Sequence, residues 1–304
     1  MVFDISRNCI NFLKTLKSKN MSTMLSFANN QISTNFLSEN DIMAKCPNAF
    51  KTEPTNPGVS DKYVQATTID VIRDMAKLGW YPVEAKQCRN KKGSKGIRSF
   101  HMIALQNPTV KVLNNNNEIE GYPRIILTNS HDGFNSFKFM CGYYRLVCSN
   151  GLIIADKEFA NISIRHINYT FEELTKTVVD ILQKLPNQIA VLNDMQNKVL
   201  TDEEKTKFAI SAIKLRKGYN EEDKVEISQE TIDELLSPVR KEDSANNLYN
   251  IYNIIQERII KGNFHYSEKQ KKMRKMRMVT SISKDLDINT NLFNLACSYV
   301  RVAA

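Results

Sequence analysis

The chain has 304 residues, 42% of them hydrophobic and 25% charged, which is enough for one large domain or two small ones with a substantial core. No apolar run approaches the roughly 18 residues that a membrane span needs. The first residues lack the basic region and the apolar core of a secretory signal. These features exclude a membrane-spanning chain and predict a cytoplasmic protein without a membrane partner.

The formal net charge is +9 at pH 7, a balance that favours polyanionic partners such as nucleic acid. Much of this charge falls in a first basic stretch, residues 89–98, and a second basic stretch, residues 269–277. Lysine and arginine neutralise phosphates without regard to base sequence. The residues expected to do so are Arg89, Lys91, Lys92, Lys95 and Arg98 in the first stretch, and Lys271, Lys272, Arg274, Lys275 and Arg277 in the second.

The six cysteines are widely scattered and include no Cys-x-x-Cys pair. This spacing argues against a zinc ribbon and against a disulfide scaffold. The chain also has no Gly-x-x-x-x-Gly-Lys loop, which disfavours an ATP-driven recombinase or helicase. We therefore expect neither a cofactor nor a resident metal.

The first half of the chain is predicted to be an antiparallel sheet with one early helix. Residues 1–60 show little periodicity and are expected to form a partly ordered arm. A helix is predicted from Thr68, as its N-cap, to Leu78, with a glycine just past its end. Strands follow at Tyr81–Arg89 and Ser99–Leu105, joined by the first basic stretch as a hairpin tip.

A hairpin in the middle of the chain is the most informative element. The run Arg124–Asp132 reads as a strand, Asp132-Gly133 is a strong turn signal, and Ser136–Cys148 is the return strand. With a side-chain period of two, one face of the return strand carries Phe137, Phe139, Cys141, Tyr143 and Arg145. Shorter strands are predicted at Val110–Leu113, Leu152–Ala155 and Asn161–Asn168.

The second half changes to helical spacing. Thr170-Phe-Glu-Glu173 and Thr201-Asp-Glu-Glu204 both fit a capping box, and Pro186 should kink or split the first helix. The chain is therefore predicted to be α+β, with residues 61–168 as the sheet layer and 169–304 as the helical layer of a single domain. Further helices are predicted at Ile232–Leu236, Ala245–Lys261 and Asp287–Val300.

Several short sequence motifs resemble the signature of a phage- and plasmid-borne family catalogued as a domain of unknown function. The similar motifs, called the signature motifs below, are Asn129–Gly133, Tyr144–Gly151, Ile164–His166, Leu78–Val83 and Leu248–Gly262. The resemblance spans roughly residues 60 to 297. It implies a mobile-element origin, a bacterial host cytoplasm and a single family domain, and it implies no known activity.

The polar residues of the signature motifs are predicted to form one cluster around the hairpin. Its members are Asn129, His131, Arg145, Asn150, Arg165 and His166. One interpretation is a metal-dependent hydrolase or nuclease with His131, Asp132 and His166 as ligands. Adjacent residues on a strand point to opposite faces, so His131 and Asp132 could share a metal only if the turn begins at Asp132.

Cys148 is a second candidate for chemistry, as a nucleophile activated by Arg145 or His166. A cysteine in a strand is more often a small apolar core residue. A third interpretation is a protein-binding anti-defence factor, although such inhibitors are commonly acidic and this chain is basic. The residues name no reaction, so they leave open whether the protein is an enzyme.

Nucleic-acid binding has the broadest support. The two basic stretches would neutralise phosphates, and Tyr143 or Tyr144 would supply stacking planes if exposed, whereas Phe137 and Phe139 are expected to be buried. A helix leading into antiparallel strands with a basic hairpin is similar to the core of ring-forming single-strand annealing proteins, an analogy of fold only. We therefore expect an accessory factor in DNA replication or recombination that binds DNA, single-stranded DNA included, with a homo-oligomer as an open alternative.

Overall fold

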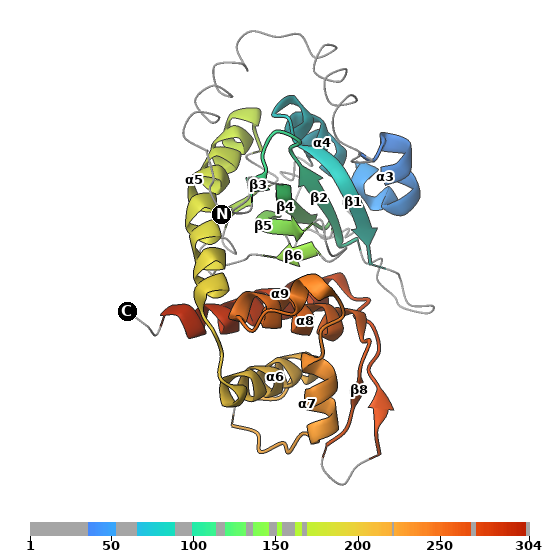
Figure 1. Ribbon diagram of the computed structural model, residues 1–304. Helices are drawn as coiled ribbons and strands as arrows, with labels where there is room; N and C mark the ends of the chain where they lie inside the picture. The colour runs from blue at the N-terminus through green and yellow to red at the C-terminus, as the bar shows by residue number, and fades with distance from the viewer. Residues whose placement is uncertain are drawn as a thin grey trace. The chain divides into compact units, whose positions relative to one another are not determined.

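The computed structural model describes residues 36–52, 66–88, 99–113, 119–131, 136–145, 151–153, 162–165, 169–220, 222–268 and 272–301 (Figure 1). The chain divides into two compact units. The sheet unit contains the described residues 36–152 and 162–186, and the helical unit contains residues 153 and 187–301. The chain is α+β, as predicted. Among the described residues, no helix has the length and apolar character to cross a membrane.

The sheet unit is built on one sheet with the strand order β1-β2-β4-β5-β6, to which β3 adds by pairing with β4 and β7 by pairing with β5. The pairs β1–β2, β2–β4 and β4–β5 are antiparallel, as expected for this half. The strands are β1 Tyr81–Gln87, β2 His101–Gln106, β3 Val112–Leu113, β4 Ile119–Asn129, β5 Phe137–Arg145, β6 Gly151–Ile153 and β7 Ser163–Ile164.

β4 is the central strand, with partners on both edges and side chains buried on both faces. Ile125, Ile126 and Leu127 are all buried, so this strand lacks the usual alternation of exposed and buried residues. β5 keeps the alternation: the predicted apolar face, from Phe137 to Tyr143, is buried, and Lys138 between its members is exposed. The expected burial of Phe137 and Phe139 is confirmed.

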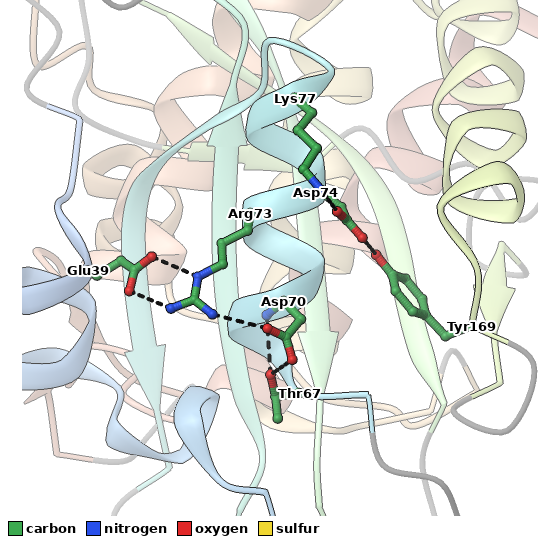
Figure 2. A network of polar contacts seen from close by, with 7 residues as sticks. All are labelled: Glu39, Thr67, Asp70, Arg73, Asp74, Lys77 and Tyr169. Carbon is green, nitrogen blue, oxygen red and sulfur yellow. Dashed lines mark hydrogen bonds and ion pairs between the residues drawn. The ribbon is translucent and has the colours of Figure 1, made fainter. Parts of the chain in front are cut away.

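Helix α4, Thr68–Lys77, covers part of the sheet through a buried face that includes Ile69, Val71, Ile72 and Met75 (Figure 2). Its N-cap is Thr67, one residue before the predicted cap, because the Thr67 hydroxyl accepts the hydrogen bond from the Asp70 amide. The Thr68 hydroxyl, the other candidate, is buried and bonds to the sheet instead. The chain leaves the helix through Gly79, whose φ of 80° suits glycine.

A polar network on the outer side of α4 attaches neighbouring segments to it (Figure 2). Arg73 donates two hydrogen bonds of 2.9 Å to the Glu39 carboxylate of α3, Glu39–Lys45, and one of 3.1 Å to Asp70. The Arg73 bonds hold the pKa of Glu39 below its usual value. Part of the predicted N-terminal arm is therefore attached to the sheet unit, although a half-exposed pair of this kind contributes about 1 kcal/mol or less.

The same helix holds the segment that precedes α5. The Tyr169 hydroxyl donates to Asp74 at 2.6 Å, and Lys77 pairs with the same carboxylate (Figure 2). Burial raises the pKa of Tyr169, so the phenol remains a donor at neutral pH. The Tyr169 ring also lies 5.9 Å from that of Phe137 in β5. This segment is thus bound to both the helix and the sheet.

The helical unit follows the long helix α5, Phe171–Asn197, which contains Pro186 and is not split by it. A proline removes one helical hydrogen bond. Burial of Leu182, Leu185, Ile189 and Leu192 on the two sides of Pro186 offsets that loss. The other elements are α6 Asp202–Lys217, α7 Gln229–Leu236, η3 Lys241–Asp243, α8 Leu248–Lys261, β8 His265–Tyr266, β9 Arg274–Lys275 and α9 Ile282–Arg301.

The ends of these helices follow the local sequence. Thr201 and Glu204 form the predicted capping box of α6, and Gly218 and Gly262 end α6 and α8 with φ values of 76° and 70°. A Cβ on Gly262 would meet the backbone of Arg277 and lie 2.6 Å from the Met276 carbonyl oxygen. Gly262 is therefore needed for the close approach of a second segment as well as for its own conformation.

These two glycines provide a matched pair for a stability test. Gly218→Ala meets no atom within 4 Å and should cost about 1–2 kcal/mol through its positive φ alone. Gly262→Ala should cost about 2–5 kcal/mol, because overpacking adds to the same conformational cost. Urea unfolding followed by circular dichroism at 222 nm measures both. Equal losses in the two variants would contradict the close approach at Gly262.

Candidate functional site

The first candidate is a buried histidine cluster in the sheet unit, formed by Thr68, Ser99, His101, Asn129 and His131. The β2–β4 register places His101 opposite Asn129. Thr68 reaches both from the first turn of α4: its hydroxyl lies 2.8 Å from His101 Nε2 and accepts from Asn129 Nδ2 at 2.9 Å. All five residues have 0% exposure.

The hydrogen bonds fix the tautomer of His101. Its Nδ1 lies 2.6 Å from the Ser99 carbonyl oxygen, which can only accept, so Nδ1 carries the proton. Nε2 of the neutral ring then accepts from the Thr68 hydroxyl, which itself accepts from the Asn129 amide. The His131 amide donates to the Ser99 hydroxyl at 2.8 Å, and the two imidazole rings lie 5.3 Å apart. Asn129, Thr68 and His101 thus form a series of hydrogen bonds that joins α4 to β2 and β4.

This arrangement explains why polar residues are tolerated at the end of the central strand. A buried polar side chain is costly unless it is hydrogen-bonded, and Thr68 meets that need for both His101 and Asn129. Among the described residues, no group of three potential metal ligands comes together. The geometry therefore supports a structural role for the cluster.

The structure brings together two of the predicted site residues and separates a third. Asn129 and His131 belong to the cluster. Arg145 lies opposite Gly121, eight residues from Asn129 along β4, or about 26 Å at the usual rise of a strand. The expectation that Arg145 joins Asn129 does not fit this register.

The remaining predicted site residues lie at or beyond the limits of the described chain. Arg165 follows β7 and is exposed. His101 was not predicted as a site residue; the available signal was its place among only four histidines, at the start of a strand. Four predicted residues lie outside the described residues: Asp132, Cys148, Asn150 and His166.

The expected stacking planes are not available in β5. Tyr143 is buried at 1% exposure, so the exposed ring that its stacking on bases would require is absent. The ring of Tyr144 is already covered by the Arg124 guanidinium, whose central carbon lies 3.9 Å from the ring centroid. Arg124 also donates to Gln106 at 3.1 Å. One face of the half-buried Tyr144 ring is therefore occupied within the sheet unit.

The second candidate is a basic hollow in the helical unit, with a volume of about 760 Å³. It lies beside the short hairpin of β8 and β9, in which Tyr266 pairs with Arg274 and His265 with Lys275. Six basic residues and one acidic residue line it. The lining residues are Arg216, Lys217, Tyr266, Ser267, Glu268, Lys272, Arg274, Lys275, Met276 and Arg277.

The backbone around this hollow is held at defined points. Arg216, in the last turn of α6, donates to the Ile259 carbonyl at 3.2 Å and to the Arg277 carbonyl at 2.7 Å. Met276 donates to the Phe264 carbonyl at 2.9 Å, beside the close approach at Gly262. Partial burial lowers the pKa of Arg216, but an arginine stays charged at neutral pH. The hairpin side chains therefore project from a fixed frame.

Two tyrosines orient the single carboxylate of the hollow. Glu268 accepts from the Tyr219 hydroxyl at 3.0 Å and from the Tyr266 hydroxyl at 2.8 Å. Burial, followed by the bond to Glu268, raises the pKa of Tyr266, so this phenol remains protonated. Lys217 Nζ lies 4.6 Å from the centroid of the Tyr266 ring, which holds that cation at the wall of the hollow.

Four cations of the second basic stretch are exposed: Lys272, Arg274, Lys275 and Arg277. None of them forms an ion pair with a carboxylate within the part of the chain that the structure describes. By contrast, Arg240 and Lys261 in the same unit both pair with Glu257. Exposed cations without partners retain their attraction for an anionic ligand. The first basic stretch and Lys271 lie outside the described residues.

The fold and the hollow together define an α+β protein with an antiparallel sheet unit and a helical unit that carries a basic hollow. The chain belongs to the family described as "Domain of unknown function (DUF932)", whose model matches residues 58–282. The resemblance to a family of unknown function is therefore confirmed. The Escherichia coli K12 proteins UPF0380 protein YafZ and UPF0380 protein YfjQ are each 26% identical to it over 262 residues, covering 86% of this chain and 90% of theirs. No solved structure matches the chain.

The histidine cluster predicts a specific loss of stability. Thr68→Val keeps the shape of the side chain but removes the hydroxyl that His101 and Asn129 both contact, and it should cost about 2–4 kcal/mol of unfolding free energy. The chain has one tryptophan, Trp80, which is buried next to the end of α4, so its fluorescence during urea unfolding reports on the sheet unit.

The control for this test is Thr175→Val in α5. The Thr175 hydroxyl donates to the Phe171 carbonyl at an exposed site, where water can replace it, and the cost should stay below about 0.5 kcal/mol. A Thr68→Val protein as stable as this control would show that the cluster does not hold α4 on the sheet.

Proposed function

We propose that the protein binds nucleic acid through phosphate contacts at the basic hollow, as an accessory factor in the DNA metabolism of a mobile element. The observation that carries the proposal is the group of four exposed cations of the second basic stretch, which lack carboxylate partners among the described residues. The similarity of the signature motifs to those of phage- and plasmid-borne proteins supports an origin in a mobile element.

Phosphate contact is the interaction that this surface is suited to make. Arginine offers a planar fork that fits two phosphate oxygens, and lysine offers a compact charge. The backbone that bears them is held by Arg216 and by the approach to Gly262, which lowers the entropy lost on binding. Contacts with phosphates do not distinguish one base from another, so binding should show little sequence preference.

The first basic stretch is proposed as a second contact region. Lys91, Lys92 and Lys95 lie within five residues of sequence, so they could contact neighbouring phosphates. Changing these three lysines to glutamine tests this region separately from the hollow. A loss of affinity in that variant alone would move the binding surface to the first basic stretch.

The salt dependence of binding tests the proposal. The triple variant Lys272→Gln, Arg274→Gln and Lys275→Gln should bind a labelled single strand more weakly than the unchanged protein does. Its slope of log affinity against log salt should be flatter by about two units, because each lost contact with a single strand removes about 0.7. Fluorescence anisotropy between about 50 and 200 mM salt measures the slope.

A charge-matched control separates site binding from general attraction. Lys207, Lys241 and Lys284 are exposed and do not line the hollow, so changing all three to glutamine removes the same charge elsewhere. This control should keep nearly the full slope. An equal effect of the two triple variants would show that the hollow contributes only through the net charge of the protein. The absence of binding at micromolar protein would contradict the proposal.

A further inference from the structure

We infer that the basic hollow selects a doubly charged phosphate monoester over a singly charged phosphodiester. The ligand would be the 5′-phosphorylated end of a nucleic-acid strand or the phosphate group of a free nucleotide, which share this chemistry. The inference rests on the nucleic-acid binding proposed above and names the part of the ligand that the hollow receives.

The first argument is the shape of the site. A strand bound along its length needs a groove that follows the backbone past many phosphates. Here six basic residues lie around one concavity of about 760 Å³, which is within the range of about 300–1,000 Å³ typical of small-ligand pockets. They come from the last turn of α6 and from the chain on both sides of β9. A concave site of this size accommodates a chain end better than a continuous backbone.

The second argument is the charge. Six basic side chains and one carboxylate line the hollow. A phosphate monoester carries a charge of about −1.5 to −2 at neutral pH and presents three strong acceptor oxygens. A phosphodiester inside a strand carries one negative charge. The excess of positive charge around the hollow is therefore better matched by the monoester, and arginine forks can bind two of its oxygens at once.

Two of the basic side chains beside the hollow are held in place before any ligand binds. Arg216 is held by two carbonyl oxygens, and Lys217 is held over the Tyr266 ring. Fixed charges lose little freedom when an anion binds. Lys272 and Arg274, which are exposed, can then close on the outer oxygens of the same group.

The test compares three ligands by fluorescence anisotropy with the full chain: a 5′-phosphorylated oligonucleotide, the same oligonucleotide with a 5′-hydroxyl, and AMP as a competitor. We expect the 5′-phosphorylated strand to bind about tenfold more tightly than the 5′-hydroxyl strand, because the added charge faces several cations. The Lys272, Arg274 and Lys275 triple variant should lose this ratio, and the charge-matched control should keep it.

A second readout is the pH dependence of the same ratio. A phosphate monoester loses its second charge below a pKa of about 6 but keeps the first, so the tenfold ratio should fall by about pH 5 and stay above one. His265, paired with Glu234, and the carboxylate Glu268 also face this region, but their titration affects both oligonucleotides and largely cancels in the ratio. A ratio that stays constant with pH would contradict charge selection.

The outcomes separate the inference from the proposed function. Equal binding of the two oligonucleotides at pH 7.5 overturns the inference and leaves nucleic-acid binding intact. Binding of AMP at the hollow with no binding of either strand supports monoester selection, assigns a free nucleotide as the ligand, and overturns the proposed function. No binding of any of the three overturns both.

Discussion

The pairing of β4 on both of its edges is the constraint on which the sheet unit depends. Its register with β2 sets His101 opposite Asn129, and its register with β5 sets Arg145 opposite Gly121. A slip of one residue would exchange the two faces of the strand, and both faces are filled with buried side chains. One register therefore decides which polar residues meet: it gathers the histidine cluster at one end of β4 and places Arg145 near the other.

Two adjacent threonines then divide the polar contacts at the start of α4. Thr67 caps the helix, and Thr68 turns inward to the histidine cluster. A cap is worth about 1 kcal/mol, and an unsatisfied buried polar group costs about 1–3 kcal/mol. Both needs arise at the same helical turn, so neither threonine can replace the other. The helix is consequently fixed to the sheet by hydrogen bonds at its first turn and by apolar packing along its length.

Local signals in the sequence were enough for the fold class and for much of the element order. The Thr201 capping box, the glycine stop at Gly262 and the alternation along β5 all act within a few residues, and all are observed. Pro186 was expected to kink or split the helix, and α5 is not split because burial along it outweighs one lost hydrogen bond. His101 and the hollow could not be found in this way, since they depend on strand register and on segments far apart in the sequence, such as Arg216 and Arg277.

The sheet unit buries the histidine cluster, whereas the helical unit leaves four cations of the second basic stretch exposed. Two of the five residues of the histidine cluster, Asn129 and His131, belong to the signature motifs. The hydrogen bonds of Thr68, Asn129 and the His131 amide are made within the sheet unit, where they hold the fold together. The hollow keeps four cations in water without carboxylate partners among the described residues. Exposed charges cost folding little and retain their attraction for an anion. Asn129 and His131, two residues of the signature motifs, are thus explained by their contacts in the fold, and the exposed cations of the second basic stretch are the feature on which the binding proposal rests.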